Sequence, residues 1–207
     1  MKVNSQIRTE ARVTLRGNWG ALAVVTLVYI LLNSVGNITD KLLGSAYIQC
    51  IWVLLMLPLV WSYSVLFLSL TRGNGGTWAD LFCGYKDFSR IFCTSLLASI
   101  YTLLWSCLLI VPGIIKNYSY AMIPYILKDE PMLKNNAAIE RSMVLMDGYK
   151  MKLFLLSLSF LGWFLLCVLS LGIGLLWLIP YISTSYATFY EDVKKDYEVR
   201  IQATAKE

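Results

Sequence analysis

The sequence predicts an all-α protein: a polytopic membrane helix bundle with six transmembrane helices and three amphipathic interfacial helices on its cytoplasmic side. Three observations predict this class. Apolar residues make up 57% of the 207 residues and charged residues only 15%, whereas water-soluble domains average about 45–50% and 25%. Several apolar runs are long enough to cross a bilayer. The basic residues between these runs are arranged as the positive-inside bias requires.

Five runs reach the roughly 18 apolar residues that a spanning helix needs. They are residues 19–36, 47–70, 91–111, 152–170 and 173–190. We expect the first run to remain as a span rather than to be cleaved as a signal peptide. The basic segment before it is long for a signal peptide and has a helical pattern of its own.

The run 113–127 decides the topology of the chain. If it stays outside the membrane, the chain crosses five times and leaves seven basic residues inside and eleven outside. If it crosses, sixteen lie inside and two outside, Lys41 and Lys116. The bias toward basic cytoplasmic loops therefore predicts a sixth span. This span is short, about 22 Å at 1.5 Å per residue, and we expect Pro112 and Gly113 to form the outer turn before it.

This topology makes residues 1–190 one membrane domain and residues 191–207 a cytoplasmic C-terminal tail. Both termini then lie in the cytoplasm, and we expect the chain in the bacterial cytoplasmic membrane. The lipid bilayer is its first partner.

The helix expected at 4–16 has two faces. Val3, Ile7, Ala11 and Leu15 repeat every four residues, and so do Arg8, Arg12 and Arg16. This pattern is typical of a basic amphipathic helix. On an anionic inner leaflet each basic residue adds about 1 kcal/mol of attraction, so we expect these arginines to contact anionic inner-leaflet lipids.

Two further amphipathic helices are expected at 77–89 and 135–147. Thr77 and Asp80 have the spacing of a capping box, Asn135 or Asn136 can cap the second helix, and Gly148 ends it. The three helices either seal the underside of the bundle or form a docking surface for acidic lipids or an unidentified membrane-protein partner. The sequence leaves both alternatives open.

Reactive groups are scarce. The sequence has no histidine, which is the usual general base and the commonest metal ligand. Its five cysteines lack C-x-x-C spacing and predict buried free thiols. Proton relays and cation sites need intramembrane carboxylates, and no Asp or Glu falls inside an expected span. We therefore expect no cofactor, no metal, no nucleic-acid partner and no enzymatic activity.

Two features of the spans favour a polar path instead. Ser95, Ser99, Thr102 and Ser106 share one face of the third span. Such a stripe is usually a helix-packing surface, and a water-lined path is the alternative. The motif "IPYI" occurs at 123–126 and 179–182, in the fourth and sixth spans. Paired Pro-broken spans are typical of transporter substrate sites.

Several segments resemble one family. "PGIIKNYSYAMIPYILKDEPMLKNNAAIERSMVLMDGYK" (112–150), "LSFLGW" (158–163), "IPYISTSYATFY" (179–190) and "ARVTLRGNWG" (11–20) are similar to the DUF975 family of bacterial integral membrane proteins. The resemblance implies a multi-span protein with no assigned activity and a mainly structural motif. The motif residues are Pro112, Gly113, Tyr120, Pro124, Tyr125, Asp129, Ala138, Ser142, Gly148, Pro180 and Tyr181.

The central part of this motif is also similar, more distantly, to the membrane domain attached to some glycerophosphodiester phosphodiesterases. The chain lacks the catalytic domain of those enzymes. It also departs from the family pattern ahead of Ala138, where Lys134 and Ala137 replace a Ser and an acidic residue. We expect the third amphipathic helix to be capped less well for that reason.

Three functions remain in competition. The favoured one is a non-catalytic accessory or scaffolding protein, because no reactive constellation accompanies the three candidate docking helices. The alternative is a transporter or channel for a small or lipid-like solute through spans three, four and six. An enzyme acting at the lipid interface would have to use Asp129, Asp147 and Lys150, which the sequence otherwise explains as solvated helix ends.

Overall fold

The computed structural model describes the chain except for residues 44–45, 76 and 205–207, and the side chains of 37, 39–43, 46 and 204 also lie outside the description. Every regular element of the described residues is a helix. In order these are α1 (Asn4–Leu15), α2 (Trp19–Leu43), α3 (Ala46–Thr71), η1 (Trp78–Tyr85, a 3-10 helix), α4 (Phe88–Leu108), α5 (Ile110–Tyr120), α6 (Ile123–Asp129), α7 (Asn136–Leu145), α8 (Lys150–Leu158), α9 (Leu161–Leu169) and α10 (Leu175–Thr204).

Four helical stretches of the described chain are long and apolar enough to cross a membrane. They are Trp19–Gly36, Tyr47–Thr71, Phe88–Leu108 and Lys150–Leu169. They coincide with four of the six expected spans and indicate a membrane protein. The last stretch is α8 and α9 together, with Ser159 and Phe160 between them in a turn.

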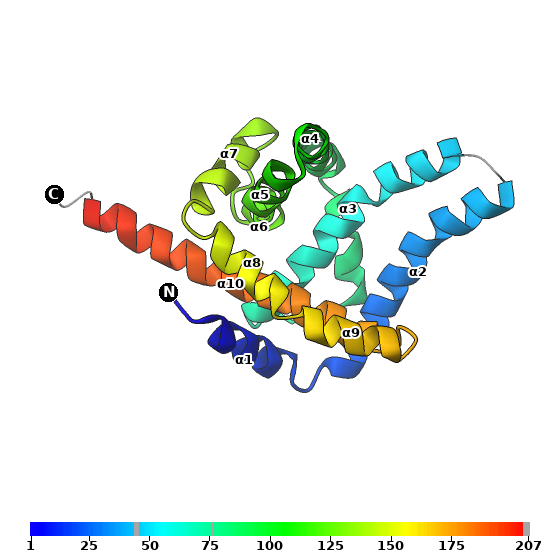
Figure 1. Cartoon of the computed structure of the whole chain (residues 1–207), viewed down its shortest axis with the longest axis horizontal. Helices are drawn as coiled ribbons and strands as arrows, with labels where there is room; N and C mark the ends of the chain where they lie inside the picture. The colour runs from blue at the N-terminus through cyan, green and yellow to red at the C-terminus, as the bar shows by residue number, and fades with distance from the viewer. Residues whose placement is uncertain (44–45, 76, 205–207) are drawn as a thin grey trace.

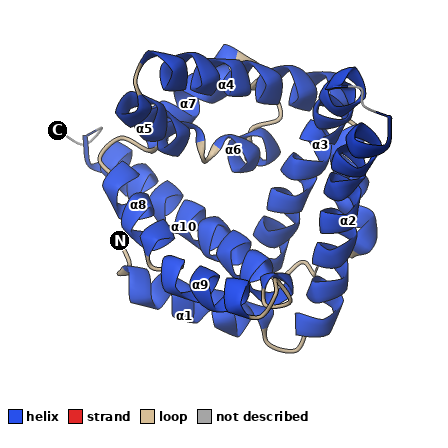
Figure 2. Cartoon of the chain, turned by 45° about the vertical axis from the view of Figure 1, so that its right-hand side comes forward, coloured by secondary structure: helices blue, strands red, loops and turns tan. Residues whose placement is uncertain are grey.

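The helices form three hairpins that diverge from a shared packed end. α2 pairs with α3, α4 with α5, and α9 with α10, and Figure 2 shows the three pairs on different sides of the molecule. In Figure 1 the α2–α3 pair projects furthest from the rest. α10 is the central element, because it packs against α1, α2, α3, α7 and α9.

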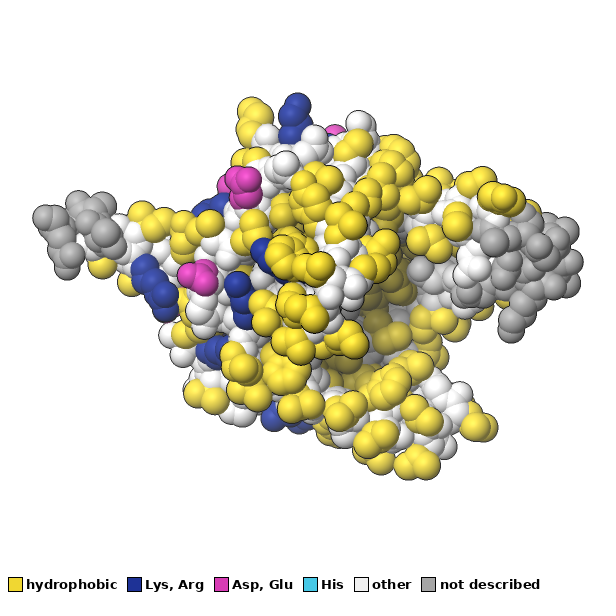
Figure 3. Space-filling view, turned by 45° about the horizontal axis from the view of Figure 1, so that its top comes forward, with side chains coloured by type: hydrophobic (Ala, Val, Ile, Leu, Met, Phe, Trp, Pro, Cys, Tyr) yellow, Lys and Arg dark blue, Asp and Glu magenta, His cyan; other side chains and the backbone are white. Residues whose placement is uncertain are grey.

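We call the packed end of the molecule the base. It contains α1, η1, α7, the ends of α3 and α6 and the middle of α10. Its core consists of buried apolar side chains from these elements, among them Ile7, Leu15, Phe67, Leu68, Leu81, Met146, Phe189 and Val193. Charged side chains gather over the left part of Figure 3, whereas apolar side chains cover most of the remaining visible surface.

The expected span 113–127 is divided between two helices. The chain turns at Leu109, whose extended backbone (φ −155°, ψ 138°) ends α4 and begins α5. Pro112 and Gly113 therefore lie in the first turns of α5 and do not form the outer hairpin. Proline is tolerated there because the first helical N–H groups have no partner within the helix. A second turn at Ala121 and Met122 separates α5 from α6.

Gly113 instead allows α5 to approach α4. A Cβ atom built at this glycine would lie 2.8 Å from the Cα of Ser106 and 2.5 Å from its Oγ. Real Cβ atoms do not approach backbone this closely, so any larger residue would push the two helices apart. The motif glycine is explained by helix packing rather than by a turn.

The segment expected as a tail continues the last helix. α10 runs without a break from Leu175 to Thr204, so its second half occupies most of 191–207. Contacts with the base hold this part in place: Lys194 binds Asp129, and Asp192 accepts a hydrogen bond from the backbone N–H of Lys2. At least two charged side chains of the segment expected as a tail therefore form contacts within the protein.

The apolar face of α1 belongs to the core. Ile7, Ala11 and Leu15 have no exposed surface, and α1 packs on α10. The stripe that sequence periodicity identifies is therefore buried against protein. In η1, Asp80 accepts a hydrogen bond from the backbone N–H of Thr77 at 2.7 Å, which is the expected cap, although Trp78 is 70% exposed.

Candidate functional site

Asp129 is the centre of an ionic network in the base. Its carboxylate accepts two hydrogen bonds from Arg72 at 2.7 Å, one from Lys194 at 2.6 Å and one from the hydroxyl of Tyr190 at 2.9 Å. Arg72 also binds Glu191 at 2.7 Å. The network joins the end of α3, the end of α6 and the middle of α10.

The electrostatics of Asp129 follow from these partners. Its side chain is only 7% exposed, and burial alone would raise the pKa of the carboxyl group. The hydrogen bonds from Arg72, Lys194 and Tyr190 outweigh burial and lower the pKa to about 2. Asp129 is therefore ionised near neutral pH, and its charge holds the ends of α3 and α6 against α10.

Other motif residues extend the same packing. Tyr125 stacks on Tyr190, with ring centroids 5.1 Å apart. The hydroxyl of Ser142 donates to the backbone carbonyl of Ser119 at 2.8 Å and ties α7 to α5. Ala138 is fully buried beside it on α7. Together these residues fix α6 and α7 to the rest of the base.

The two motif prolines differ in their setting. The sequence predicts that Pro124 breaks a spanning helix, but Pro124 lies in the first turn of α6, where it removes no hydrogen bond within that helix. Pro180 lies inside α10, where the hydroxyl of Thr184 donates to the Pro180 carbonyl at 2.8 Å. The two "IPYI" copies therefore do not have equivalent structures.

The hydroxyl stripe of α4 lines a groove of about 560 Å³. All four of its members, Ser95, Ser99, Thr102 and Ser106, lie along this groove. The opposite wall includes Asn117, Tyr120 and Pro124 from α5 and α6. No residue of α10 is among the described residues that line it, so the structure does not bring spans three, four and six around one path.

Three of the four hydroxyls of this stripe donate within their own helix. Ser99 donates to the carbonyl of Ser95, Thr102 to that of Ala98 and Ser106 to that of Thr102, each at 2.8 Å. One donor in the groove wall is not satisfied: the buried indole N–H of Trp61 has no acceptor among the described residues. The groove is polar only locally.

The candidate groups for interfacial catalysis are not assembled. Asp129 is engaged by Arg72 and Lys194, and Asp147 is exposed. Within the described part of the chain, no ion pair joins Asp147 or Lys150 to Asp129, and no three His, Cys, Asp or Glu residues are placed to hold a metal ion. The five cysteines are free thiols, as predicted, but most are not buried. Cys167 is buried and Cys83 is half-buried, whereas Cys50, Cys93 and Cys107 are exposed.

The α1 arginines differ from the other arginines. Arg72, Arg90, Arg141 and Arg200 each form an ion pair with a carboxylate. Arg8, Arg12 and Arg16 have no carboxylate partner among the described residues. The Nε atom of Arg8 is buried and also has no acceptor there. Arg12 and Arg16 are exposed, so an anion outside the described chain can reach them.

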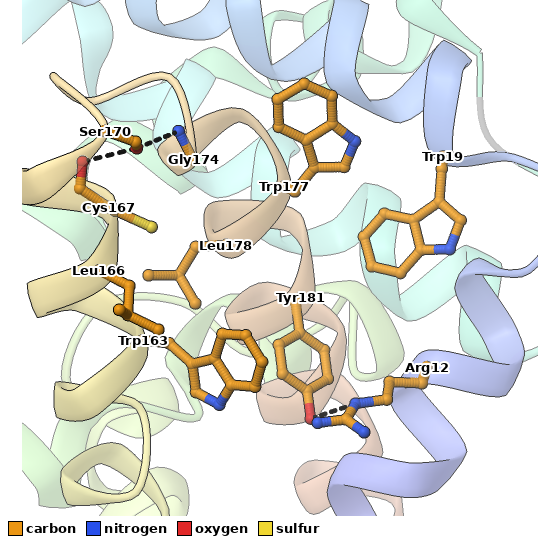
Figure 4. A pocket seen from close by; sticks show the side chains of 10 residues that line it. All are labelled: Arg12, Trp19, Trp163, Leu166, Cys167, Ser170, Gly174, Trp177, Leu178 and Tyr181. Carbon is orange, nitrogen blue, oxygen red and sulfur yellow. Dashed lines mark hydrogen bonds between the residues drawn. The ribbon is translucent and has the colours of Figure 1, made fainter.

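Arg12 lies at one end of an apolar pocket of about 490 Å³ (Figure 4). The pocket is bounded by α1, the start of α2, α9 and the first part of α10. Its lining residues are Arg12, Trp19, Trp163, Leu166, Cys167, Ser170, Gly174, Trp177, Leu178 and Tyr181. The Nε of Arg12 donates to the hydroxyl of Tyr181 at 3.1 Å, and its guanidinium lies 5.3 Å from that ring and 5.9 Å from the ring of Trp163.

The sequence predicts separate roles for Arg12 and Tyr181 but does not predict this pocket. Trp19, Trp163 and Trp177 come from three helices, and only the tertiary structure brings them together. Trp19 and Trp177 lie near the ends of apolar runs, where indole rings favour the membrane boundary, whereas Trp163 lies inside its run and carries no such signal.

Comparison with known proteins identifies the family. Two regions, residues 1–119 and 108–197, match the family described as "Protein of unknown function (DUF975)". No curated protein and no solved structure matches the chain. Because the two regions together include nearly the whole sequence, the chain belongs to the DUF975 family.

Proposed function

We propose that this chain is a six-span, non-catalytic accessory or scaffolding protein of the bacterial cytoplasmic membrane, with the base and both termini in the cytoplasm. The charge distribution supports this orientation, since sixteen of the eighteen basic residues then lie inside. The α2–α3 and α4–α5 hairpins also support it, because each would cross the membrane outward and return. Leu109 and the turn at residues 170–174 then lie outside, together with the connection between α2 and α3.

α5 and α6 together can make the fourth crossing. They provide 18 helical residues, Ile110–Tyr120 and Ile123–Asp129, with a combined rise of about 27 Å, close to the roughly 30 Å of the hydrocarbon core. Met122, one of the two residues in the turn between α5 and α6, is fully buried in the core. Its backbone is therefore covered by protein, as an irregular segment at membrane depth must be.

The observation that carries the scaffolding role is the exposure of the hairpins. Only 22% of the Trp19–Gly36 window, 11% of Phe88–Leu108 and 22% of Lys150–Leu169 are buried within the chain. A carrier or pump encloses its path between packed helices, whereas these helices present most of their surface to lipid or to another protein. The ion pairs of the base meanwhile hold the hairpins in fixed positions.

Photo-crosslinking in native membranes tests this role. A photoreactive amino acid at Leu104, which is 61% exposed on α4, should form a discrete adduct with another membrane protein. The same group at Leu97 of α4, which is partly buried against a cluster that includes Trp61 and Ile123, is the matched control and should not. Adducts with lipid alone at Leu104 and at its neighbour Leu103 would contradict the scaffolding role.

A transporter or channel for a small or lipid-like solute is the second candidate. The groove along α4 favours it, because it combines four hydroxyl-bearing residues with the unsatisfied indole N–H of Trp61. Proteoliposomes containing the purified chain separate the two functions. The scaffolding proposal expects no flux of ions, lipids or peptides above empty vesicles, and flux that Ser99→Phe blocks would favour the transporter.

A further inference from the structure

The unpaired arginines of α1 point to a ligand that the chain does not itself supply. A cation next to apolar surface is unfavourable unless it is solvated or paired. Arg72, Arg90, Arg141 and Arg200 are paired with carboxylates of this chain. Arg12 has instead one hydroxyl, that of Tyr181, and two aromatic rings. Its two terminal amino groups remain free to donate to an anion.

The cavity beside Arg12 is almost entirely apolar. Leu166, Leu178 and three indole rings form most of its walls, as Figure 4 shows. Arg12 and Tyr181 lie at one end, and Ser170 and Gly174 mark the opposite end, where the turn between α9 and α10 lies. The cavity thus has one cationic end and a long apolar remainder.

We propose that this pocket binds one phospholipid with an anionic headgroup. Its phosphate contacts Arg12, and one acyl chain lies between α9, α10 and the start of α2. Guanidinium groups bind phosphate through two parallel N–H donors. Indole rings suit the boundary between headgroup and chain, because they combine a large apolar surface with one N–H donor.

Charge and shape together select this occupant. A water-soluble anion would satisfy Arg12 but leave the apolar walls uncovered, and an uncharged apolar molecule would fill the walls but leave Arg12 unpaired. The cavity of about 490 Å³ falls within the roughly 300–1,000 Å³ of ligand pockets. Arg8 is one helical turn from Arg12 but does not line the pocket, so Arg12 is the cation that meets the phosphate.

This inference is independent of the scaffolding role. It requires the chain in a membrane but no partner protein, so a lipid can occupy the pocket whether or not crosslinking finds a partner. It also differs from attraction of the whole basic stripe to an anionic surface. A surface effect depends on the number of charges, whereas a pocket depends on one arginine and on the space beside it.

Native mass spectrometry of the purified full chain tests the proposal. The detergent-solubilised protein is incubated with phosphatidylglycerol or with phosphatidylcholine of the same acyl chains, and the fraction that retains one lipid is measured. We expect phosphatidylglycerol to be retained preferentially. Arg12→Gln should reduce its retention about tenfold, equivalent to about 1.4 kcal/mol. Arg16→Gln removes the same charge from the same helix outside the pocket and should leave retention within about twofold.

A second pair of variants tests whether an acyl chain occupies the apolar part of the pocket. Leu166→Trp adds volume to the pocket wall and should reduce lipid retention while Arg12 stays in place. Val168→Trp makes a comparable change at an exposed position of α9 that does not line the pocket, and should have little effect. Because these two variants alter no charge, they separate occupancy of the pocket from electrostatic attraction. Arg12→Lys, which keeps the charge, should retain more lipid than Arg12→Gln.

Four results would overturn the proposal. Equal losses in Arg12→Gln and Arg16→Gln would show diffuse surface attraction. Equal retention of the two lipids would show that the headgroup charge is not recognised. Unchanged retention in a folded Leu166→Trp variant would show that no chain enters the pocket. Displacement of the lipid by glycerol phosphate, which has the headgroup chemistry without chains, would assign the arginine to a soluble anion.

Discussion

Arg72 and Asp129 form a two-point ion pair, with both nitrogen–oxygen distances at 2.7 Å, that joins the end of α3 to the end of α6. Lys194 of α10 completes the contact at 2.6 Å. Because the Asp129 side chain is nearly buried, removal of its charge leaves Lys194 without this anion and Arg72 with Glu191 alone. A broken buried pair costs about 3–5 kcal/mol, and the partial exposure of Arg72 and Lys194 reduces this cost by solvation.

Asp129→Asn should therefore lower stability by about 2–3 kcal/mol. Asp87→Asn is the matched control, since Asp87 is 66% exposed and pairs with Arg90 at 3.3 Å, and it should cost under about 1 kcal/mol. Thermal unfolding of the two purified variants in the same detergent measures the difference. Equal melting temperatures would show that the network contributes no stability.

The Asp129 carboxylate also predicts that the stability of the folded chain depends on pH. The pKa of Asp129 is lowered from 3.8 to about 2 in the folded chain. The unfolded chain therefore takes up this proton first as pH falls. The stability that Asp129 contributes is complete above about pH 3.8 and is lost as pH falls toward 2. The gap in melting temperature between the unmodified chain and Asp129→Asn should narrow across this range, and a constant gap would refute the assignment.

Gly148 should be more sensitive to substitution than a helical glycine. Its φ is +78°, and no atom lies within 4 Å of a Cβ built there, so any cost comes from the backbone alone. Gly148→Ala should cost about 1–2 kcal/mol. Gly162→Ala, in α9 with equally open surroundings, should be neutral or slightly stabilising because alanine favours helices.

Thermal unfolding of the two alanine variants checks this contrast. The sequence alone suggests comparing Gly148→Val with Gly44→Val, but Gly44 lies outside the described residues. If Gly148→Ala melts at the temperature of Gly162→Ala, then Gly148 does not hold the left-handed conformation.

Two serines should respond differently to alanine. Ser142 is fully buried and donates to a carbonyl of another helix, that of Ser119, so Ser142→Ala should cost about 1–3 kcal/mol. Ser99 is exposed and donates within its own helix, so Ser99→Ala should change stability by less than about 0.5 kcal/mol. Urea or thermal unfolding in detergent measures both, and a larger effect at Ser99 would indicate that the α4 stripe carries helix contacts that the fold does not show.

The helical class and four long apolar helices follow from local pattern, and the structure confirms them. Apolar runs such as 47–70 are long enough that no other element fits. The cap at Thr77 and Asp80 is equally local, since it depends on a spacing of three residues. Features set by one segment and its immediate neighbours were therefore predictable.

Features set by distant contacts were not. The four-residue repeat of apolar residues identifies the apolar face of α1, but it does not predict whether lipid or α10 covers that face. The charges of 191–207 resemble a solvated tail until Asp129 and the backbone of Lys2 are found beside them. The pocket at Arg12 likewise requires Trp19, Trp163 and Trp177 to come together from three helices. In each case the deciding partner is far away in the sequence.

The six-span arrangement can be tested with two single cysteines in a chain whose five native cysteines are replaced. Met132, between α6 and α7, and Leu171, between α9 and α10, are each 93% exposed, so a thiol at either position is equally accessible to a reagent on its own side. A membrane-impermeant maleimide added to intact cells should label Leu171→Cys, and should label Met132→Cys only after permeabilisation. Labelling of Met132→Cys in intact cells would place the base outside and contradict the topology.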